Sequence, residues 1–145
     1  GVVAIGSNHI RQSVAAWLAD NGIGFITAIH PSARIARGVT LSAGTVVMAN
    51  AVINSDTYIG KHVIINTSAS IDHDCVIGDG VHIAPGTTLC GSVSVGKNSM
   101  VGAGSTIIPN LNIGENVVIG AGSTVISDLP DNVTAVGSPA RIIKQ

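Results

Sequence analysis

Aromatic residues are nearly missing from this chain of 145 residues, which holds one Trp, one Tyr and one Phe, or 2% of its length. A hydrophobic core must therefore be built from Val, Ile, Leu and Ala, which suits a narrow core better than a wide globule. Charged residues are also scarce, at 10%, and the formal net charge is −1. Without a basic face to neutralise phosphates, a nucleic-acid partner is not expected.

Three further absences narrow the class of protein. No apolar run is long enough to span a bilayer, because Gly, Ser, Asn or Asp interrupts the apolar residues every few positions. No segment has the pattern of a signal peptide. The two cysteines, Cys75 and Cys90, form neither a metal-binding motif nor a disulfide framework. The sequence therefore predicts a cytoplasmic protein that does not bind membranes, in which Cys75 is a small buried side chain.

The chain is rich in one pattern, an aliphatic residue at every sixth position from residue 35 to residue 125 without interruption. Six is a multiple of the two-residue period of a strand, so all these side chains can point to one side of extended backbone. A period of six fits the 3.6-residue period of a helix badly. Short repeats of this kind stack into a solenoid, in which each unit covers the apolar face of its neighbour. We therefore predict a mainly β fold, a β-helix.

Glycine often follows the repeated aliphatic residue directly, and a small or β-branched residue comes four positions after it in most repeats. Repeated glycine suits corners, where the backbone turns tightly. With three hexads per circuit, residues 31–130 would form about five coils. The spacing alone also permits four faces per coil.

Residues 1–30 have a different pattern, which indicates the C-terminal remnant of a larger, Rossmann-like α/β domain. Residues 2–5 and 25–29 have the composition of two strands. Between them, four apolar residues at helical spacing predict an amphipathic helix: Ile10, Val14, Trp17 and Leu18. The order strand, helix, strand is that of a βαβ unit. At the other end, residues 131–145 are predicted to form a cap over the last coil.

The strongest candidate for chemistry is His73, which stands between Asp72 and Asp74. Nearby negative charge favours the imidazolium, so this histidine should be more basic than usual. Such a group suits a general base near neutral pH. An exposed polar corner without a function would have the same sequence. His82 follows nine residues later, and by spacing alone it could equally be a packing histidine.

No metal site is predicted within one chain. Zinc sites use three or more ligands, often with two of them close in sequence, whereas His62, His73 and His82 are 11 and 9 residues apart. Only ligands shared between chains would allow one. We expect His62 to lie on the surface. The sequence Gly6-Ser7-Asn8 before the predicted helix is a weak signal for a phosphate site, because N–H groups at a helix N-terminus attract anions.

Several longer motifs occur outside the simple repeat: Ala4-Ile5-Gly6-Ser7-Asn8, Ile29-His30-Pro31-Ser32-Ala33, Asn66-Thr67-Ser68, Asp72-His73-Asp74-Cys75-Val76-Ile77-Gly78 and Val136-Gly137-Ser138-Pro139-Ala140. Together they resemble the hexapeptide-repeat sugar acyltransferases of the sialic acid O-acetyltransferase-like type. The resemblance is strongest to the bacterial enzymes that acetylate the 4-amine of a UDP-linked amino sugar, as in the bacillosamine pathway. It implies a left-handed parallel β-helix of triangular section, an exception to the usual right-handed crossover.

The resemblance also implies roles for individual residues. His73 would be the general base, and Asp74 would raise its basicity. The co-substrate acetyl-CoA would be bound by His82, Ala103 and Ala121. The implied reaction is a direct attack of the sugar amine on the thioester, for which the cofactor supplies the activated acyl group.

Gly6 would contact the UDP-linked amino sugar, and the family's members are homotrimers with active sites between subunits. Three alternatives remain at this stage. The acceptor could be a hydroxyl of sialic acid or of another sugar, because a base beside a thioester serves both. The coil could also be a non-catalytic trimerising scaffold, or a metal-dependent hydrase of the carbonic anhydrase type.

Overall fold

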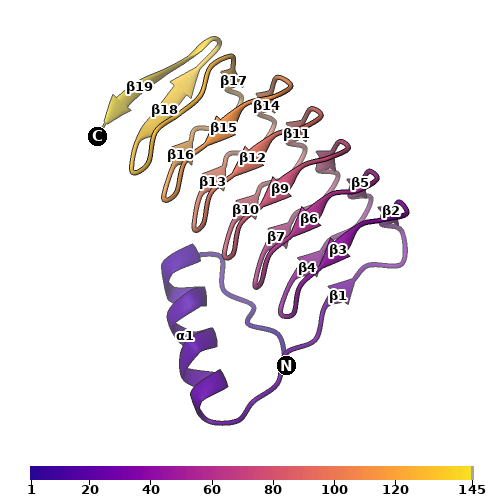
Figure 1. Ribbon diagram of the computed structural model, residues 1–145. Coiled ribbons are helices and arrows are strands. Elements are labelled where there is room, and N and C mark those ends of the chain that lie inside the picture. The colour runs from indigo at the N-terminus through magenta and orange to yellow at the C-terminus, as the bar shows by residue number, and fades with distance from the viewer. Residues whose placement is uncertain (145) are drawn as a thin grey trace.

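The computed structural model describes residues 1–144 and shows a parallel β-helix with one α-helix beside it (Figure 1). The β-helix is left-handed and has about six turns. Each strand pairs with the strand one turn later, as Ile65 pairs with Ile83. The predicted fold is therefore confirmed, with three faces per turn rather than four. The turn beyond the predicted five arises because the ladder of residues 35–125 leaves out a first rung at Ile29 and two last rungs at Leu129 and Ala135.

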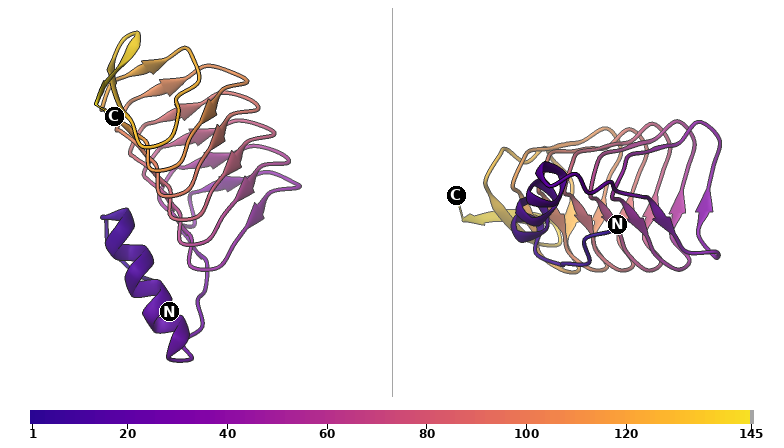
Figure 2. Two further views of the ribbon diagram at one scale, coloured as in Figure 1. Left: turned by 60° about the vertical axis from the view of Figure 1, so that its left-hand side comes forward. Right: turned by 90° about the horizontal axis from the view of Figure 1, so that it is seen from below.

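Three sheets form the faces of the prism (Figure 2). The first contains β1 (Ala28–Ile29), β4 (Val46–Val47), β7 (Ile64–Ile65), β10 (His82–Ile83), β13 (Met100–Val101), β16 (Val118–Ile119), β18 (Thr134–Gly137) and β19 (Ala140–Lys144). The second contains β2 (Arg34–Ile35), β5 (Val52–Ile53), β8 (Ser70–Ile71), β11 (Thr88–Leu89), β14 (Thr106–Ile107) and β17 (Thr124–Val125). The third contains β3 (Thr40–Leu41), β6 (Tyr58–Ile59), β9 (Val76–Ile77), β12 (Ser94–Val95) and β15 (Asn112–Ile113).

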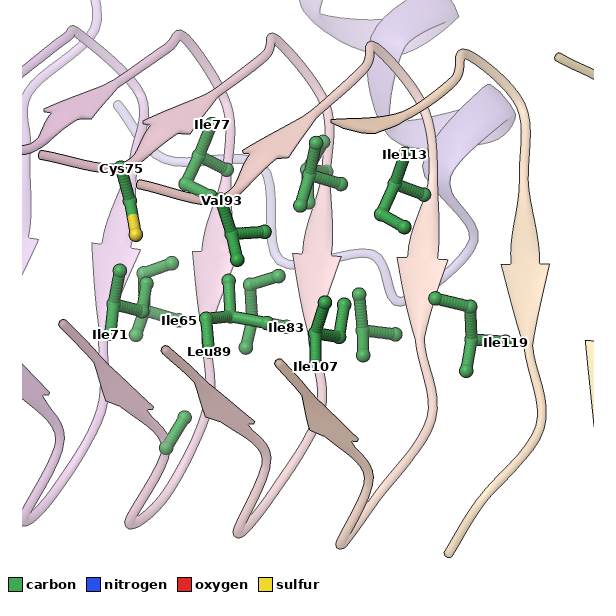
Figure 3. Packing of buried hydrophobic residues seen from close by; sticks show 14 of the residues in the cluster. Ile65, Ile71, Cys75, Ile77, Ile83, Leu89, Val93, Ile107, Ile113 and Ile119 are labelled. Carbon is green, nitrogen blue, oxygen red and sulfur yellow. The ribbon is translucent and has the colours of Figure 1, made fainter. Parts of the chain in front are cut away.

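The second residue of each short strand is the repeated aliphatic residue, and it points into the prism (Figure 3). In the middle turns these side chains are fully buried, with 0% exposure for Ile53, Ile59, Ile65, Ile71 and Ile77. Burying each such side chain stabilises the fold by about 1.5–3 kcal/mol relative to leaving it exposed. Residue Cys75 is also fully buried, as the sequence predicts.

The second inward position of the repeat carries a buried hydroxyl in several turns: Thr45, Thr57, Thr87, Ser99, Ser105 and Ser123. Thr45 is typical, since its Oγ1 donates to the carbonyl oxygen of Gly60 at 2.7 Å and accepts from the N–H of Val63 at 3.1 Å. Each hydroxyl thus satisfies main-chain groups of the next turn, and a buried polar atom is not left unpaired.

The corners of the prism are columns of residues that stack one turn apart through main-chain hydrogen bonds. Corner 1 follows the first sheet and contains Thr67, Pro85, Ala103 and Ala121. Corner 2 follows the second sheet and contains Ser55, His73 and Gly91. Corner 3 follows the third sheet and contains His62, Gly80 and Asn98.

The N-terminal segment departs from the expected βαβ unit. Residues 2–5 form no strand, and of residues 25–29 only β1 is a strand, which belongs to the β-helix. Strand-like pairing is limited to Gly1, whose N donates to Gly24 O at 2.7 Å and whose carbonyl accepts from Ile26 N at 3.1 Å. The strand prediction fails because a strand needs a neighbour, and periodicity does not show whether one is present.

The predicted helix is present as α1 (Asn8–Asp20), but the face that it buries is not the predicted one. The buried residues are Asn8, Arg11 and Ala15, whereas Ile10 and Trp17 are 55% and 64% exposed. Because Val14 and Leu18 are half-buried, the amphipathic prediction is correct for only two of its four residues, and polar side chains attach α1 to the β-helix. At the C-terminal end of the β-helix, β18 and β19 form an antiparallel hairpin along β16.

Candidate active site

His73 and Asp74 form a hydrogen-bonded pair at corner 2, on the turn between β8 and β9. Nδ1 of His73 lies 2.8 Å from Oδ2 of Asp74, and the two side chains are 55% and 61% exposed. Because a carboxylate only accepts, Nδ1 donates and Nε2 keeps its lone pair. The hydrogen bond to Asp74 and, after it, the charge of Asp72 raise the pKa of His73 above its usual value. The pair is therefore able to take up a proton at Nε2.

Asp72, the second acidic neighbour of His73, binds the main chain of His73 and not its imidazole ring. Oδ1 of Asp72 accepts from the main-chain N–H of His73 at 2.9 Å and from Nδ2 of Asn54 at 3.0 Å. These two hydrogen bonds lower the pKa of Asp72, so it is ionised at neutral pH. The sequence showed two flanking acids, and the structure separates their tasks: Asp74 orients the imidazole and Asp72 orients the turn.

The imidazole of His73 lies against Gly91, which occupies the same place in the next turn. A Cβ atom on Gly91 would come within 2.8 Å of both Cε1 and Nε2 of His73. Such a contact is too short for real atoms, so the ring can take this position only because residue 91 is glycine. Sequence reasoning missed Gly91, since nothing but its distance of one full turn from His73 connects the two residues.

His82 lies on the outer side of β10, at one end of a cavity of about 370 Å³. Its Nε2 is 3.1 Å from Nδ2 of Asn66, so Nε2 accepts and Nδ1 carries the proton. Burial, and after it the charge of Arg11, lower the pKa of His82. The cavity is otherwise lined by Val2, Val3, Ala4, Ile5, Gly6, Ala28, Val46, Met48 and Ile64. Asn66 is a second polar group of this site that the sequence analysis gave no role.

The predicted site residues fall into three places on one subunit. His73 and Asp74 are paired at corner 2, while Gly6 and His82 line the same cavity. Ala103 and Ala121 are exposed at corner 1, one turn apart, where Gly122 N donates to Ala103 O at 2.8 Å. Within a single chain these three groups do not meet.

His62 is not a surface histidine, contrary to the sequence prediction. Its ring is partly buried at corner 3 and packs edge-to-face on Phe25, with 4.6 Å between the ring centroids. Burial is the main cause that lowers the pKa of His62. Sequence reasoning failed here because Phe25 lies 37 positions away and reaches corner 3 only through the path of the N-terminal segment.

The chain matches a known protein family and several solved structures. The bacterial transferase hexapeptide (six repeats) family matches residues 56–91 and 92–127. The chain superposes with a TM-score of 0.98 on a histidine-to-asparagine mutant of perosamine N-acetyltransferase from Caulobacter crescentus, in complex with CoA and GDP-perosamine. The identity is 44%, over 99% of this chain and 69% of that chain. The chain belongs to the hexapeptide-repeat sugar acyltransferases.

Two further relatives support this family membership. The acetyltransferase domain of PglB from Neisseria gonorrhoeae FA1090, in complex with acetyl coenzyme A, has a TM-score of 0.96 and 36% identity, over 98% of this chain and 69% of that chain. UDP-N-acetylbacillosamine N-acetyltransferase from Bacillus subtilis (strain 168) is 47% identical over 48 residues, which are 33% of this chain and 22% of that protein. The chain therefore aligns with less than a quarter of this curated relative.

Two further findings concern metal-binding clusters and membrane-spanning helices. Among residues 1–144, no group of three or more His, Cys, Asp or Glu side chains comes together as a metal-binding cluster. In the same part of the chain, no helix has both the length and the apolar character needed to cross a membrane.

Proposed function

We propose that the chain transfers the acetyl group of acetyl-CoA to the 4-amine of a UDP-linked amino sugar, with His73 as the general base. The observation that carries the proposal is the exposed pair of His73 and Asp74, joined at 2.8 Å with Nε2 of the imidazole left free to accept a proton. The relatives support the donor and the class of acceptor, because they are sugar N-acetyltransferases solved with CoA or acetyl-CoA.

The reaction is a direct transfer without an acyl-enzyme. The amine nitrogen of the sugar attacks the thioester carbonyl carbon, and Nε2 of His73 accepts the proton that the nitrogen loses. The carbon–sulfur bond then breaks, so that CoA leaves as a thiolate and the sugar carries the new amide. A main-chain N–H would stabilise the oxyanion that forms on the carbonyl oxygen. Asp74 keeps the imidazole in the tautomer that accepts at Nε2.

We assign the remaining site residues to the two substrates. His82, Ala103 and Ala121 would contact acetyl-CoA, and Gly6 would contact the sugar nucleotide. On one subunit, Gly6 and His82 line the same cavity, whereas Ala103 and Ala121 lie at corner 1 and His73 lies at corner 2. In a homotrimer with active sites between subunits, corner 2 of one subunit would lie beside the cavity of its neighbour. Catalysis would then require the trimer.

We further propose a division of the chain by task. Residues 1–30 would belong to a sugar-nucleotide domain, which the parallel-type hydrogen bonds of Gly1 to Gly24 and Ile26 support. Residues 31–130 would bind acetyl-CoA, and residues 131–145, of which residue 145 lies outside the described part of the chain, would cap the β-helix. A cytoplasmic location fits the use of acetyl-CoA.

The nearest alternative is O-acetylation of sialic acid or of another sugar, since the same base would serve a hydroxyl. The names of the relatives favour the amine. A trimerising scaffold would leave the pair of His73 and Asp74 without a task. A hydrase of the carbonic anhydrase type would need metal ligands from more than one subunit, because the described residues of one chain form no such cluster.

The test is calorimetric titration with acetyl-CoA and then with a UDP-4-amino sugar and with GDP-perosamine, followed by a transfer assay that measures free CoA thiol. We expect about one acetyl-CoA per chain, and transfer to the UDP-linked amine. His73→Ala should lower kcat by about 10²–10⁴-fold, the usual span for a general base. A loss below fivefold would remove His73 from this role, and no binding of acetyl-CoA would favour the scaffold.

A further inference from the structure

Arg11 on α1 is fully buried, at 1% exposure, although no carboxylate among residues 1–144 forms an ion pair with it. Its guanidinium has five N–H donors, and all five have an acceptor. Nε donates to the carbonyl of His62 at 2.8 Å, and Nη1 donates to the carbonyls of Ile5 at 2.9 Å and Gly6 at 3.2 Å. Nη2 donates to Oδ1 of Asn8 at 2.9 Å and to the carbonyl of Gly80 at 2.7 Å.

The carbonyl acceptors of Arg11 come from two parts of the chain that are far apart in sequence. Ile5 and Gly6 belong to the N-terminal segment before α1, whereas His62 and Gly80 lie on successive turns of corner 3. Asn8 extends the same contact by one turn, since its Nδ2 donates to the carbonyls of Asn98 at 3.0 Å and Ser99 at 3.1 Å. One side chain therefore fastens the N-terminal segment to the β-helix, and a second supports it.

The hydrogen bonds of Arg11 hold one wall of the cavity that His82 lines. Residues 2–6 form one wall of the cavity, and the first sheet with His82 and Asn66 forms the other. The wall of residues 2–6 has no strand pairing of its own that would fix its distance from the sheet. Arg11 supplies the missing link, because its guanidinium holds the carbonyls of Ile5 and Gly6 at the same time as those of corner 3.

We infer that Arg11 is a positioning residue that sets the separation of the two cavity walls, and so places the acceptor sugar nucleotide at Gly6 relative to the donor at His82. The inference rests on the proposed function, in which Gly6 and His82 face different substrates. A lysine at position 11 would keep the charge but offers three donors instead of five, without the planar fork. The wall of residues 2–6 would then lose part of its attachment, while the first sheet would not change.

The test is steady-state kinetics of Arg11→Lys with each substrate varied in turn. We expect KM for the sugar nucleotide to rise at least tenfold, and KM for acetyl-CoA to change by less than twofold. The control is Arg34→Lys, because Arg34 is an exposed arginine on β2 outside both cavity walls. It should leave both KM values unchanged. A purely structural role would instead lower kcat with the folded fraction and leave both KM values as they are, which would overturn the inference.

A milder variant covers the case in which Arg11→Lys does not fold. Asn8→Ala leaves all the donors of Arg11 in place, and it removes one acceptor of Arg11 together with the two hydrogen bonds from Asn8 to Asn98 and Ser99. KM for the sugar nucleotide should therefore rise in the same direction. An unchanged KM in folded Asn8→Ala would count against the inference. The wild-type chain distinguishes failure of the proposed function from failure of the positioning role. If the wild type transfers no acetyl group, the proposed function fails. If the wild type transfers normally, but the Arg11 and Asn8 variants do not raise KM for the sugar nucleotide selectively, only the positioning role fails.

Discussion

The imidazole of the proposed general base lies against Gly91, so Gly91→Ala tests directly where the imidazole must lie. The backbone of Gly91 is not in the left-handed region, and alanine can adopt its conformation. The added Cβ would lie 2.8 Å from Cε1 and Nε2 of His73, whereas ordinary contacts begin at 3.4 Å. The ring must therefore move outward by about 0.6 Å or rotate, and Nε2 moves with it.

A displacement of this size has a predictable kinetic cost. Misplacing a reacting group by about 1 Å can cost about 10²-fold in rate, so we expect Gly91→Ala to lower kcat about 10- to 100-fold. The exposed ring can yield towards solvent, which means that the fold should survive. The assay is release of CoA thiol at saturating substrates, together with thermal unfolding. Gly24→Ala is the matched control, because a Cβ at Gly24 would meet nothing within 4 Å.

Two outcomes would refute this reasoning. A kcat within twofold of the wild type, with an unchanged unfolding midpoint, would mean that the working position of His73 is not the one against Gly91. An equal loss of kcat in Gly24→Ala would mean that added methyl groups act through general destabilisation. Either result would withdraw the argument that Gly91 makes room for the base.

Three further predictions follow from named contacts. Asp74→Asn removes the charge that raises the pKa of His73, so the acid limb of the kcat/KM profile should move to lower pH and kcat should fall about tenfold; an unmoved limb would contradict the pairing. Thr57→Val leaves a partly buried carbonyl and a buried N–H without their partner and should cost about 1–3 kcal/mol in urea unfolding, whereas Thr88→Val, on an exposed strand position, should cost little. The lowered pKa of His62 means that its contribution to stability is present above the usual pKa of 6.5 and is lost as pH falls below it. His62→Asn should therefore flatten the pH dependence of the unfolding free energy between pH 5 and pH 7, and an unchanged slope would assign that dependence to other groups.

The coil itself was predictable because its cause is local and repeated. An aliphatic residue at every sixth position can be buried on only one side of extended backbone, so Ile53 or Ile71 could be placed in the core without knowing which strand lies beside it. The pairing of His73 with Asp74 was predictable for the same reason, since adjacent residues on a corner are always close. The number of faces was not, because three and four faces have the same hexad spacing.

The contacts that the sequence did not predict join residues that are close in space. Their distance along the chain does not indicate that they are close. The helix was expected to bury Trp17, because apolar residues usually mark the inner face. Instead it buries Arg11, two of whose five hydrogen bonds reach carbonyls on successive turns of the β-helix. No pattern in a single sequence indicates that an arginine is buried without a carboxylate partner. Likewise, His62 became a packed residue through Phe25, a contact that depends on the path of the N-terminal segment.

The proposed base of this family member is built from three consecutive turns. Asn54 on the turn before supports Asp72, which holds the main chain of His73, and Gly91 on the turn after leaves room for the ring. These residues lie in equivalent places of successive coils, so the parallel stacking of the β-helix fixes their distances more firmly than a loop could. A repeat architecture can therefore create a site by changing the residue type in one column, from a small residue to a histidine and back, while every rung of the core keeps its aliphatic residue. It follows that catalytic residues in such a coil are best sought by comparing residues one turn apart, where a bulky polar group faces a glycine.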